Sequence, residues 1–131
     1  MDKAHVSPVA TFENYTKAFQ SLDAKAVARY FDEPALMITP QGVRGLPDAA
    51  AVEQAYARIM AELPAQRYAR TEFSKIEERR LGDDLTLLTG SGSWVDTDGR
   101  RFMPFGLTYA LRRKGQDWRI VVAMVHSADA K

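Results

Sequence analysis

The sequence contains no cysteine and no long uninterrupted run of apolar residues among its 131 positions. Without cysteine there can be no disulfide, no thiolate metal site and no thiol nucleophile. No apolar run approaches the roughly 20 residues that a membrane-spanning helix needs. Residues 1–8 carry Asp2, Lys3 and His5 and lack the apolar centre of a signal peptide. Together these absences predict a cytoplasmic protein that does not contact a membrane.

The chain also has almost no excess charge, since 18 basic side chains oppose 17 acidic ones and leave a formal net charge of +1. A balance so close to zero gives no general attraction to nucleic acid. The short basic run at 112–114 is interpreted as the solvated end of a hairpin rather than as a phosphate-binding patch. The two histidines, His5 and His126, have no partner at ligand spacing, so neither a metal nor another cofactor is expected.

The first half of the chain has the end signals and the periodicity of three helices. Ser7-Pro8 is a helix start, and apolar side chains then recur at three- and four-residue spacing, at Val9, Phe12, Tyr15, Phe19 and Leu22. Asp23 caps a second, shorter helix that we expect to end at Pro34. A third helix is predicted from Pro47-Asp48 until Pro64 stops it.

Most of the remaining chain alternates between apolar and polar residues, which is the period of strands. Four such segments follow the third helix: Tyr68–Leu81, Leu85–Asp96, Arg101–Arg113 and Trp118–Ser127. The Asp98-Gly99 pair between two of them is a strong hairpin signal, because both residues tolerate positive φ. Upstream, residues 35–39 predict a short strand, and Gly42 and Gly45 predict a loop.

Helices followed by a meander of strands predict an α+β fold. We expect a cone-shaped, strongly bent antiparallel sheet wrapped around the three helices of the N-terminal half. A length of 131 residues fits one domain over residues 1–131, with frayed ends at 1–6 and 128–131.

The turns also predict which side chains share a face of the sheet. A two-residue loop at Asp98-Gly99 and a four-residue loop at 114–117 place ten side chains toward the helices: Trp94, Met103, Phe105, Leu107, Tyr109, Trp118, Ile120, Val122, Met124 and His126. The opposite face then carries Val121, Ala123 and Val125 among small residues. Because an apolar face of this kind is typical of a covered surface, we expect a homodimer through these three residues.

The first long strand has no unique register. A two-residue loop after Leu81 would turn Lys75 and Glu77 inward, whereas a three-residue loop would turn Glu72 and Glu78 inward. Both alternatives stay open, and with them the question of whether a carboxylate enters the interior.

Four stretches of the chain follow a pattern found in a known superfamily: FENYTKAFQSLDAKAVARYF, GVRGLPDAAAVEQAYARI, RRLGDDLTLLTG and WRIVVAMVHS. With them, the order of elements resembles the nuclear transport factor two-like superfamily, which includes ketosteroid isomerases and SnoaL-like polyketide cyclases. The resemblance implies a cone of bent sheet around an internal pocket, often in a dimer. It implies no single function, because function varies widely among proteins of this fold.

The similarity to ketosteroid isomerases in particular is partial. It places Tyr15 where that family keeps an oxyanion-hole tyrosine, but it places Thr39 near the general-base aspartate and Thr108 near the second oxyanion-hole acid. Threonine can neither abstract a proton as a carboxylate does nor donate as strongly as a protonated acid. The chain is therefore unlike a ketosteroid isomerase at two key positions.

Two functional hypotheses result. The first is a pocket for a small, largely hydrophobic molecule, with an isomerase, cyclase or hydratase as its catalytic form; His126 is then the candidate acid or base and Tyr15 a catalytic hydrogen-bond donor. The predicted pocket residues are Tyr15, Phe19, Thr39, Tyr56, Trp94, Phe105, Tyr109, Met124 and His126. The alternative is a non-catalytic dimerisation or protein-interaction module with a vestigial pocket.

Overall fold

Three helices form in the first half of the chain, as predicted. The computed structural model describes residues 7–127, so the ends predicted to be frayed lie outside the described residues. Each helix begins after a side chain that accepts a hydrogen bond from a backbone N–H three residues later: Ser7 at 3.0 Å, Asp23 at 3.0 Å and Asp48 at 2.9 Å. The elements are α1 (Pro8–Gln20), α2 (Ala24–Ala28), α3 (Ala49–Ala61) and a 3₁₀ turn, η1 (Pro64–Gln66). Within residues 7–127, no helix is long and apolar enough to cross a membrane.

The segment between α2 and α3 contains more strand than predicted. The second helix ends before Pro34, and Phe31 already belongs to strand β1 (Phe31–Thr39). Gly42 and Gly45 lie in strand β2 (Gly42–Leu46), which pairs antiparallel with β1, so the predicted loop is wrong. Its place at the edge of the sheet explains why β2 tolerates two glycines, because an edge strand has fewer neighbours to pack against.

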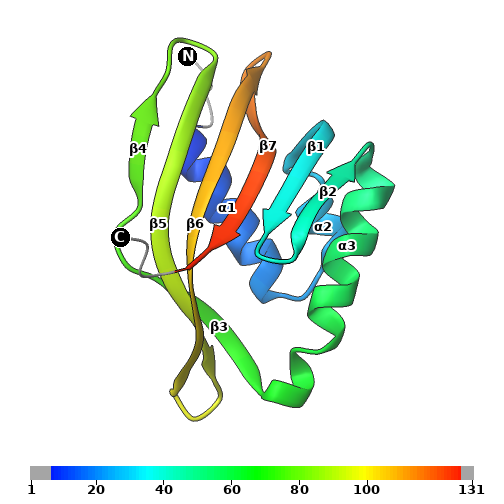
Figure 1. Ribbon diagram of the computed structural model, residues 1–131, viewed down its shortest axis with the longest axis vertical. Helices are drawn as coiled ribbons and strands as arrows, with labels where there is room; N and C mark the ends of the chain where they lie inside the picture. Colours follow the sequence, from blue (N-terminus) through cyan, green and yellow to red (C-terminus); the bar gives the residue numbers. More distant parts are fainter. Residues whose placement is uncertain (1–6, 128–131) are drawn as a thin grey trace, which may run out of the picture.

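The remaining strands complete one seven-stranded sheet in the order β2-β1-β7-β6-β5-β3, with β4 also paired to β5. Their bounds are β3 (Tyr68–Phe73), β4 (Glu77–Arg80), β5 (Leu85–Asp96), β6 (Arg101–Lys114) and β7 (Asp117–His126). All neighbours are antiparallel except β1 and β7, which run parallel. The predicted α+β class is thus confirmed. In Figure 1 the long strands β5 and β6 bend along the molecule, and α3 stands beside the β1–β2 hairpin.

The first predicted strand is interrupted. Residues 74–76 leave the ladder between β3 and β4, and they lie against Gly90 of β5. A Cβ at Gly90 would lie 2.8 Å from the carbonyl oxygen of Lys75, a distance that real Cβ contacts do not reach. Glycine at this position therefore permits the close approach of the interrupted segment.

The β5–β6 hairpin differs from the prediction in two ways, and the resulting shifts in register cancel. The N–H of Asp96 donates to the carbonyl of Arg100 at 2.9 Å, so the loop has three residues instead of two. A bulge near Met103, whose φ is 53°, adds one residue to β6 and restores the register. As a result Trp94 pairs with Phe102 rather than with Met103. The predicted pairs that form are Leu88–Tyr109, Gly90–Leu107 and Gly92–Phe105.

The β6–β7 hairpin departs from its predicted register because β7 contains a bulge. The turn sets the predicted pairing of Arg113 with Trp118, but Val121 has no partner in the ladder. From there on every pair is shifted by one residue, so Tyr109 lies opposite Ala123. A shift of one residue exchanges the two faces of a strand.

Beyond Val121 the two faces of β7 are therefore the reverse of those predicted, whereas Trp118 and Ile120, before the bulge, are buried as predicted. Ala123, which is 1% exposed, and Val125 point toward the helices. Val122, Met124 and His126 project from the outer face of the sheet, and their predicted inward placement is wrong. Two of the three residues predicted to form a dimer surface, Ala123 and Val125, therefore lie on the inner face of the sheet.

The core lies between the inner face of the sheet and the three helices. It consists largely of buried aromatic and aliphatic side chains, among them Phe12, Tyr15, Phe19, Val52, Tyr56, Leu88, Leu107, Tyr109, Leu111 and Ile120. Burial of such side chains stabilises a fold by about 1.5–3 kcal/mol each relative to exposure. Toward one end this packing is incomplete and leaves a cavity.

Candidate functional site

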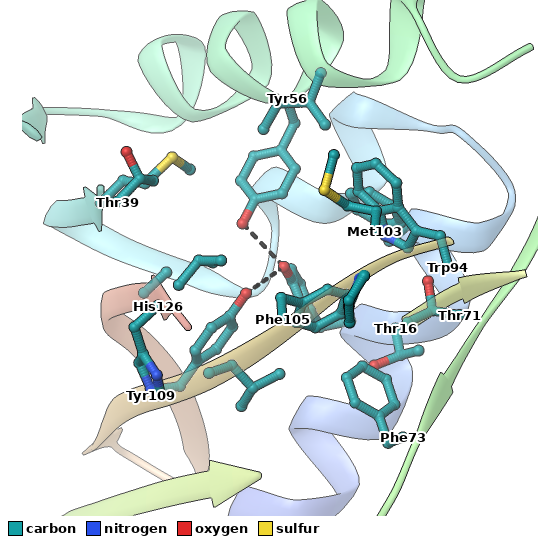
Figure 2. A pocket seen from close by; sticks show the side chains of 18 of the residues that line it. Thr16, Thr39, Tyr56, Thr71, Phe73, Trp94, Met103, Phe105, Tyr109 and His126 are labelled. Carbon is teal, nitrogen blue, oxygen red and sulfur yellow. Dashed lines mark hydrogen bonds between the residues drawn. The ribbon is translucent and has the colours of Figure 1, made fainter. Parts of the chain in front are cut away.

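A cavity of about 410 Å³ lies between the helices and the inner face of the sheet. This volume is within the usual range for small-molecule sites. The lining residues come from α1, α3 and five strands; they are Tyr15, Thr16, Phe19, Met37, Thr39, Pro40, Gln41, Tyr56, Ile59, Thr71, Phe73, Trp94, Met103, Pro104, Phe105, Leu107, Tyr109, Ala123, Val125 and His126. Figure 2 shows most of these side chains around the cavity.

The cavity has an exposed mouth and a buried end. Pro40 and Gln41 of the β1–β2 turn line it, as do Met103 and Pro104 of the β6 bulge, and all four residues are exposed. At the opposite end the lining consists of buried side chains, including Leu107. A ligand that entered between the β1–β2 turn and the β6 bulge would therefore lose contact with solvent as it moved toward the buried end.

Three tyrosine hydroxyls meet at the buried end. The hydroxyl oxygen of Tyr15 lies 2.9 Å from that of Tyr56 and 2.7 Å from that of Tyr109, both within hydrogen-bond distance. The three residues are 6%, 3% and 4% exposed, respectively, and come from α1, α3 and β6. In Figure 2 the dashed lines from the hydroxyls of Tyr56 and Tyr109 meet at one shared oxygen, which is that of Tyr15. We refer to Tyr15, Tyr56 and Tyr109 as the tyrosine triad.

The triad contains one more proton than its internal hydrogen bonds use. Each neutral tyrosine hydroxyl supplies one proton, so the group has three protons for two hydrogen bonds. In every possible arrangement of donors and acceptors, one of the three O–H groups does not donate within the triad and can donate elsewhere. Because all three residues line the cavity, this donor is available to a ligand oxygen.

Burial keeps the tyrosine triad neutral. It raises the pKa of Tyr15 and that of Tyr56 well above the ordinary value, and the nearby Tyr109 hydroxyl adds to both shifts. Burial also raises the pKa of Tyr109, but the nearby hydroxyls, that of its hydrogen-bond partner Tyr15 first, oppose this shift. All three groups are therefore protonated near neutral pH and act as hydrogen-bond donors and acceptors rather than as phenolates.

Aromatic rings form much of the remaining wall. Trp94 stacks on Phe19 with ring centroids 6.2 Å apart and an interplanar angle of 25°, and it contacts Phe105 edge-on at 6.4 Å. Rings arranged in this way form a rigid apolar surface with few rotatable bonds. The cavity therefore combines a flat apolar wall with the tyrosine triad and the separate hydroxyls of three threonines, Thr16, Thr39 and Thr71.

His126 is directed away from the tyrosine triad. Its ring lies over Gly106, where an added Cβ would be 2.7 Å from Nδ1. Nδ1 lies 3.1 Å from the carbonyl oxygen of Ser127, and because a carbonyl can only accept, Nδ1 carries a proton. Nε2 lies 3.0 Å from the Thr108 hydroxyl on the outer face of the sheet. The residue borders the cavity, but its imidazole does not reach the Tyr15 hydroxyl in the way predicted (Figure 2).

The cavity brings together eight of the nine predicted pocket residues: Tyr15, Phe19, Thr39, Tyr56, Trp94, Phe105, Tyr109 and His126. Met124 is absent from its lining because the Val121 bulge turns that side chain outward. The bulge equally explains two lining residues that sequence reasoning missed, Ala123 and Val125. Thr108 also faces outward, and its neighbour Tyr109 occupies the interior beside Tyr15.

The register of β3 settles the inward residues of that strand. Thr71 pairs with Trp94 and Phe73 with Gly92, and both β3 residues line the cavity. Glu72 lies on the other face, where it forms ion pairs with two arginines. In the part of the chain that the structure describes, no aspartate or glutamate lines the cavity. Nor do residues 7–127 contain a group of three or more side chains placed to hold a metal ion.

Residues 8–128 match the family described as NTF2-like protein (DUF6841). The chain belongs to this NTF2-like family. The match spans nearly all of the described residues and includes both the tyrosine triad and the mouth of the cavity. Among curated proteins, none matches the chain in sequence.

Solved structures share the NTF2-like fold at low sequence identity. A Thiobacillus denitrificans protein, provisionally designated a calcium/calmodulin-dependent protein kinase type II association domain, is 17% identical with a TM-score of 0.77, over 96% of this chain and 98% of that one. An NTF2-like protein with a cystatin-like fold from Novosphingobium aromaticivorans is 17% identical with a TM-score of 0.75, over 92% and 79%. The protein Aln2 from a Streptomyces species is 16% identical with a TM-score of 0.74, over 94% of each chain. At these identities the likeness concerns the fold alone.

Proposed function

We propose that this NTF2-like protein binds a small, largely hydrophobic molecule that carries a hydrogen-bond-accepting oxygen. The observation that carries the proposal is the O–H of the tyrosine triad that has no partner within the triad, at the buried end of a largely apolar cavity. A donor in such a place gains most from a partner that arrives with the ligand, because an unsatisfied buried hydroxyl costs about 1–3 kcal/mol. A ketone, ester or ether oxygen on an apolar ring system has the required chemistry.

Binding has stronger support than catalysis. Hydroxyls that donate to a carbonyl could stabilise a developing oxyanion. Proton abstraction would need a base within about 3 Å of the ligand, and Thr39 cannot provide one. The candidate base, His126, is hydrogen-bonded on the outer face. The isomerase, cyclase or hydratase form of the hypothesis therefore lacks a base close to the tyrosine triad.

A matched pair of ligands tests the proposal. 2-Acetylnaphthalene and 2-ethylnaphthalene have nearly the same shape, but only the ketone accepts a hydrogen bond. Each would be titrated against N-phenyl-1-naphthylamine, whose fluorescence reports occupancy of an apolar site. We expect both to displace the reporter and the ketone to bind about fivefold more tightly, since one neutral hydrogen bond contributes about 1 kcal/mol.

The control is a variant in which Tyr15, Tyr56 and Tyr109 are all replaced by phenylalanine. This change removes every hydroxyl at once, and replacing all partners of a buried hydrogen-bond group by apolar groups of the same shape is nearly neutral for stability. The ketone preference should vanish while the hydrocarbon still binds. Equal affinities of the two ligands for the wild-type protein would contradict the role of the tyrosine triad, and absence of reporter binding would contradict the pocket itself.

We also propose, as a second function, that the protein dimerises through the outer face of the sheet. Leu36 is 39% exposed and Val43 is 68% exposed, and both share this face with Val122 and Met124. This surface replaces the one predicted from the sequence. Light scattering at tens of micromolar should show a dimer, and Met124→Glu should convert it to a monomer. A wild-type monomer at that concentration would contradict the proposal.

A further inference from the structure

A second cavity of about 320 Å³ adjoins the first on the side of α3. It lies between the β1–β2 hairpin and α3, and its lining includes Met37, Thr39, Gln41 and Ile59, which also line the main cavity. The two spaces therefore share a wall at the mouth. A ligand in the main cavity could extend into the second one without crossing the fold.

The second cavity differs from the first in carrying two positive charges. Arg44 of β2 lies opposite Met37 in the ladder, so its side chain is on the cavity side of the hairpin. Arg58 precedes Ile59 in α3 and lines the same space. The main cavity, by contrast, is lined by neither lysine nor arginine.

Neither of these arginines is neutralised. Across residues 7–127, the side chains of Arg44 and Arg58 form no ion pair and no hydrogen bond, and no aspartate or glutamate lines the second cavity. Several arginines elsewhere are paired: Arg112, for example, contacts Asp32 at 3.0 Å. Each guanidinium carries a planar fork of N–H donors that suits an oxyanion, and both side chains line the same concave surface.

We infer that the natural ligand is an amphipathic oxyanion, whose carboxylate or phosphate head lies between Arg44 and Arg58 while its apolar body fills the main cavity. The inference rests on the proposed function, because it concerns the far end of the same ligand. It adds a charge requirement that the tyrosine triad cannot impose. Exposure of both arginines sets the expected gain at about tenfold rather than more, because solvent weakens such contacts.

The test uses three probes that share a ten-carbon chain: decanoate, decyl phosphate and 1-decanol. Each would displace N-phenyl-1-naphthylamine from the wild-type protein, from Arg44→Gln/Arg58→Gln and from Arg29→Gln. Arg29 is a suitable control because it is exposed, lines neither cavity and makes no side-chain ion pair among the described residues. We expect at least one anion to bind the wild-type protein and Arg29→Gln about tenfold more tightly than the alcohol does.

In Arg44→Gln/Arg58→Gln the advantage of the anion should fall to less than twofold, while affinity for 1-decanol stays the same. The advantage in the wild-type protein should also shrink as salt is raised, since the charges are near the surface. Which anion binds more tightly identifies the head group. Equal binding of the alcohol and both anions would overturn this inference and leave the apolar pocket standing. Failure of the reporter and 1-decanol to bind would instead contradict the proposed function.

Discussion

Two polar clusters lie on opposite faces of the same sheet, and they differ in how fully their members are paired. On the inner face, the tyrosine triad is neutral and retains one hydroxyl proton beyond its internal needs. On the outer face, Asp32 is 3% exposed and accepts hydrogen bonds from Lys114 at 2.8 Å, from Arg112 at 3.0 Å and from the N–H of Glu33 at 2.9 Å. We refer to Asp32, Arg112 and Lys114 as the carboxylate cluster.

The difference separates a structural role from a binding role. A buried carboxylate needs compensation for lost hydration, and the two cations and one amide of the carboxylate cluster supply it. Both oxygens of the Asp32 carboxylate are engaged within the protein. The tyrosine triad needs less compensation because it is uncharged, and it keeps a donor directed at a cavity. We therefore expect changes in the first cluster to alter stability and changes in the second to alter binding.

The largest expected effect is on stability, from Asp32→Asn. The change removes the negative charge while keeping the shape, so that an amide N–H₂ faces cationic donors. We expect a loss of about 2–3 kcal/mol in the free energy of unfolding, somewhat below the cost for fully buried pairs because both cations are half exposed. Chemical denaturation would measure it, with Asp117→Asn at an exposed pair as the control. Equal losses of stability in Asp32→Asn and Asp117→Asn would contradict the structural role of the carboxylate cluster.

Lowering the pH should remove part of the stability that the Asp32 carboxylate contributes. Burial alone would raise the pKa of Asp32, but hydrogen bonds from Lys114, from the N–H of Glu33 and from Arg112 outweigh it and lower the pKa. A carboxylate whose pKa is lower in the folded state stabilises the protein above its unfolded pKa of about 4, and this contribution is lost as pH falls through the folded pKa. The stability gap between wild type and Asp32→Asn should therefore narrow as the pH falls below about 5. A gap that widened toward acid would contradict the assignment.

Within the tyrosine triad, the single change Tyr15→Phe should cost more stability than replacement of all three tyrosines. Tyr15 is the common partner, so its loss strands the hydroxyls of Tyr56 and Tyr109, whereas the triple change strands none. We expect a loss of about 1–2 kcal/mol for the single variant and a smaller loss for the triple variant. Thermal unfolding of both proteins would measure the order. The reverse order would show that the hydroxyls contribute to folding as a network.

The smallest effect should come from Lys114→Gln. Its side chain is 51% exposed, and Arg112 remains to pair with Asp32. We therefore expect a loss of at most about 1 kcal/mol. The same denaturation measurement, repeated at high salt, should reduce the difference further. A loss as large as that of Asp32→Asn would mean that the two cations do not share the carboxylate.

The hairpin registers show which parts of the fold the sequence could predict. The β5–β6 register agrees with the prediction only because a loop one residue longer than expected and a bulge of one residue shift it in opposite directions. The bulge at Val121 had no such compensation and no local signal, since it lies in a run of apolar residues that satisfies either face. Its position follows instead from tertiary contacts, including the parallel pairing of β1 with β7.

The site was predictable where helical spacing decided it and unpredictable where strand register did. Tyr15 and Tyr56 were placed by the helix period, and Tyr109 lies in the part of β6 whose pairing with β5 agrees with the prediction, so all three reach the interior. Met124 lies beyond the bulge and faces outward instead. Asp32 gave no signal at all, because its partners are 80 and 82 residues away in the sequence. The basic run at 112–114 thus supports a buried carboxylate as well as ending a hairpin.

The spare proton of the tyrosine triad has an entropic consequence. The free O–H can belong to Tyr56, to Tyr15 or to Tyr109, and each choice reverses the direction of one or both hydrogen bonds without moving a ring. The empty site can therefore occupy three arrangements of its protons. A ligand whose acceptor atom fixes one of these three proton arrangements excludes the other two, which costs about RT ln 3, or roughly 0.65 kcal/mol. The free O–H can move from one tyrosine to another by rotation of the hydroxyl groups alone. The same three side chains can therefore donate to ligands whose acceptor atoms lie at different positions along the cavity wall.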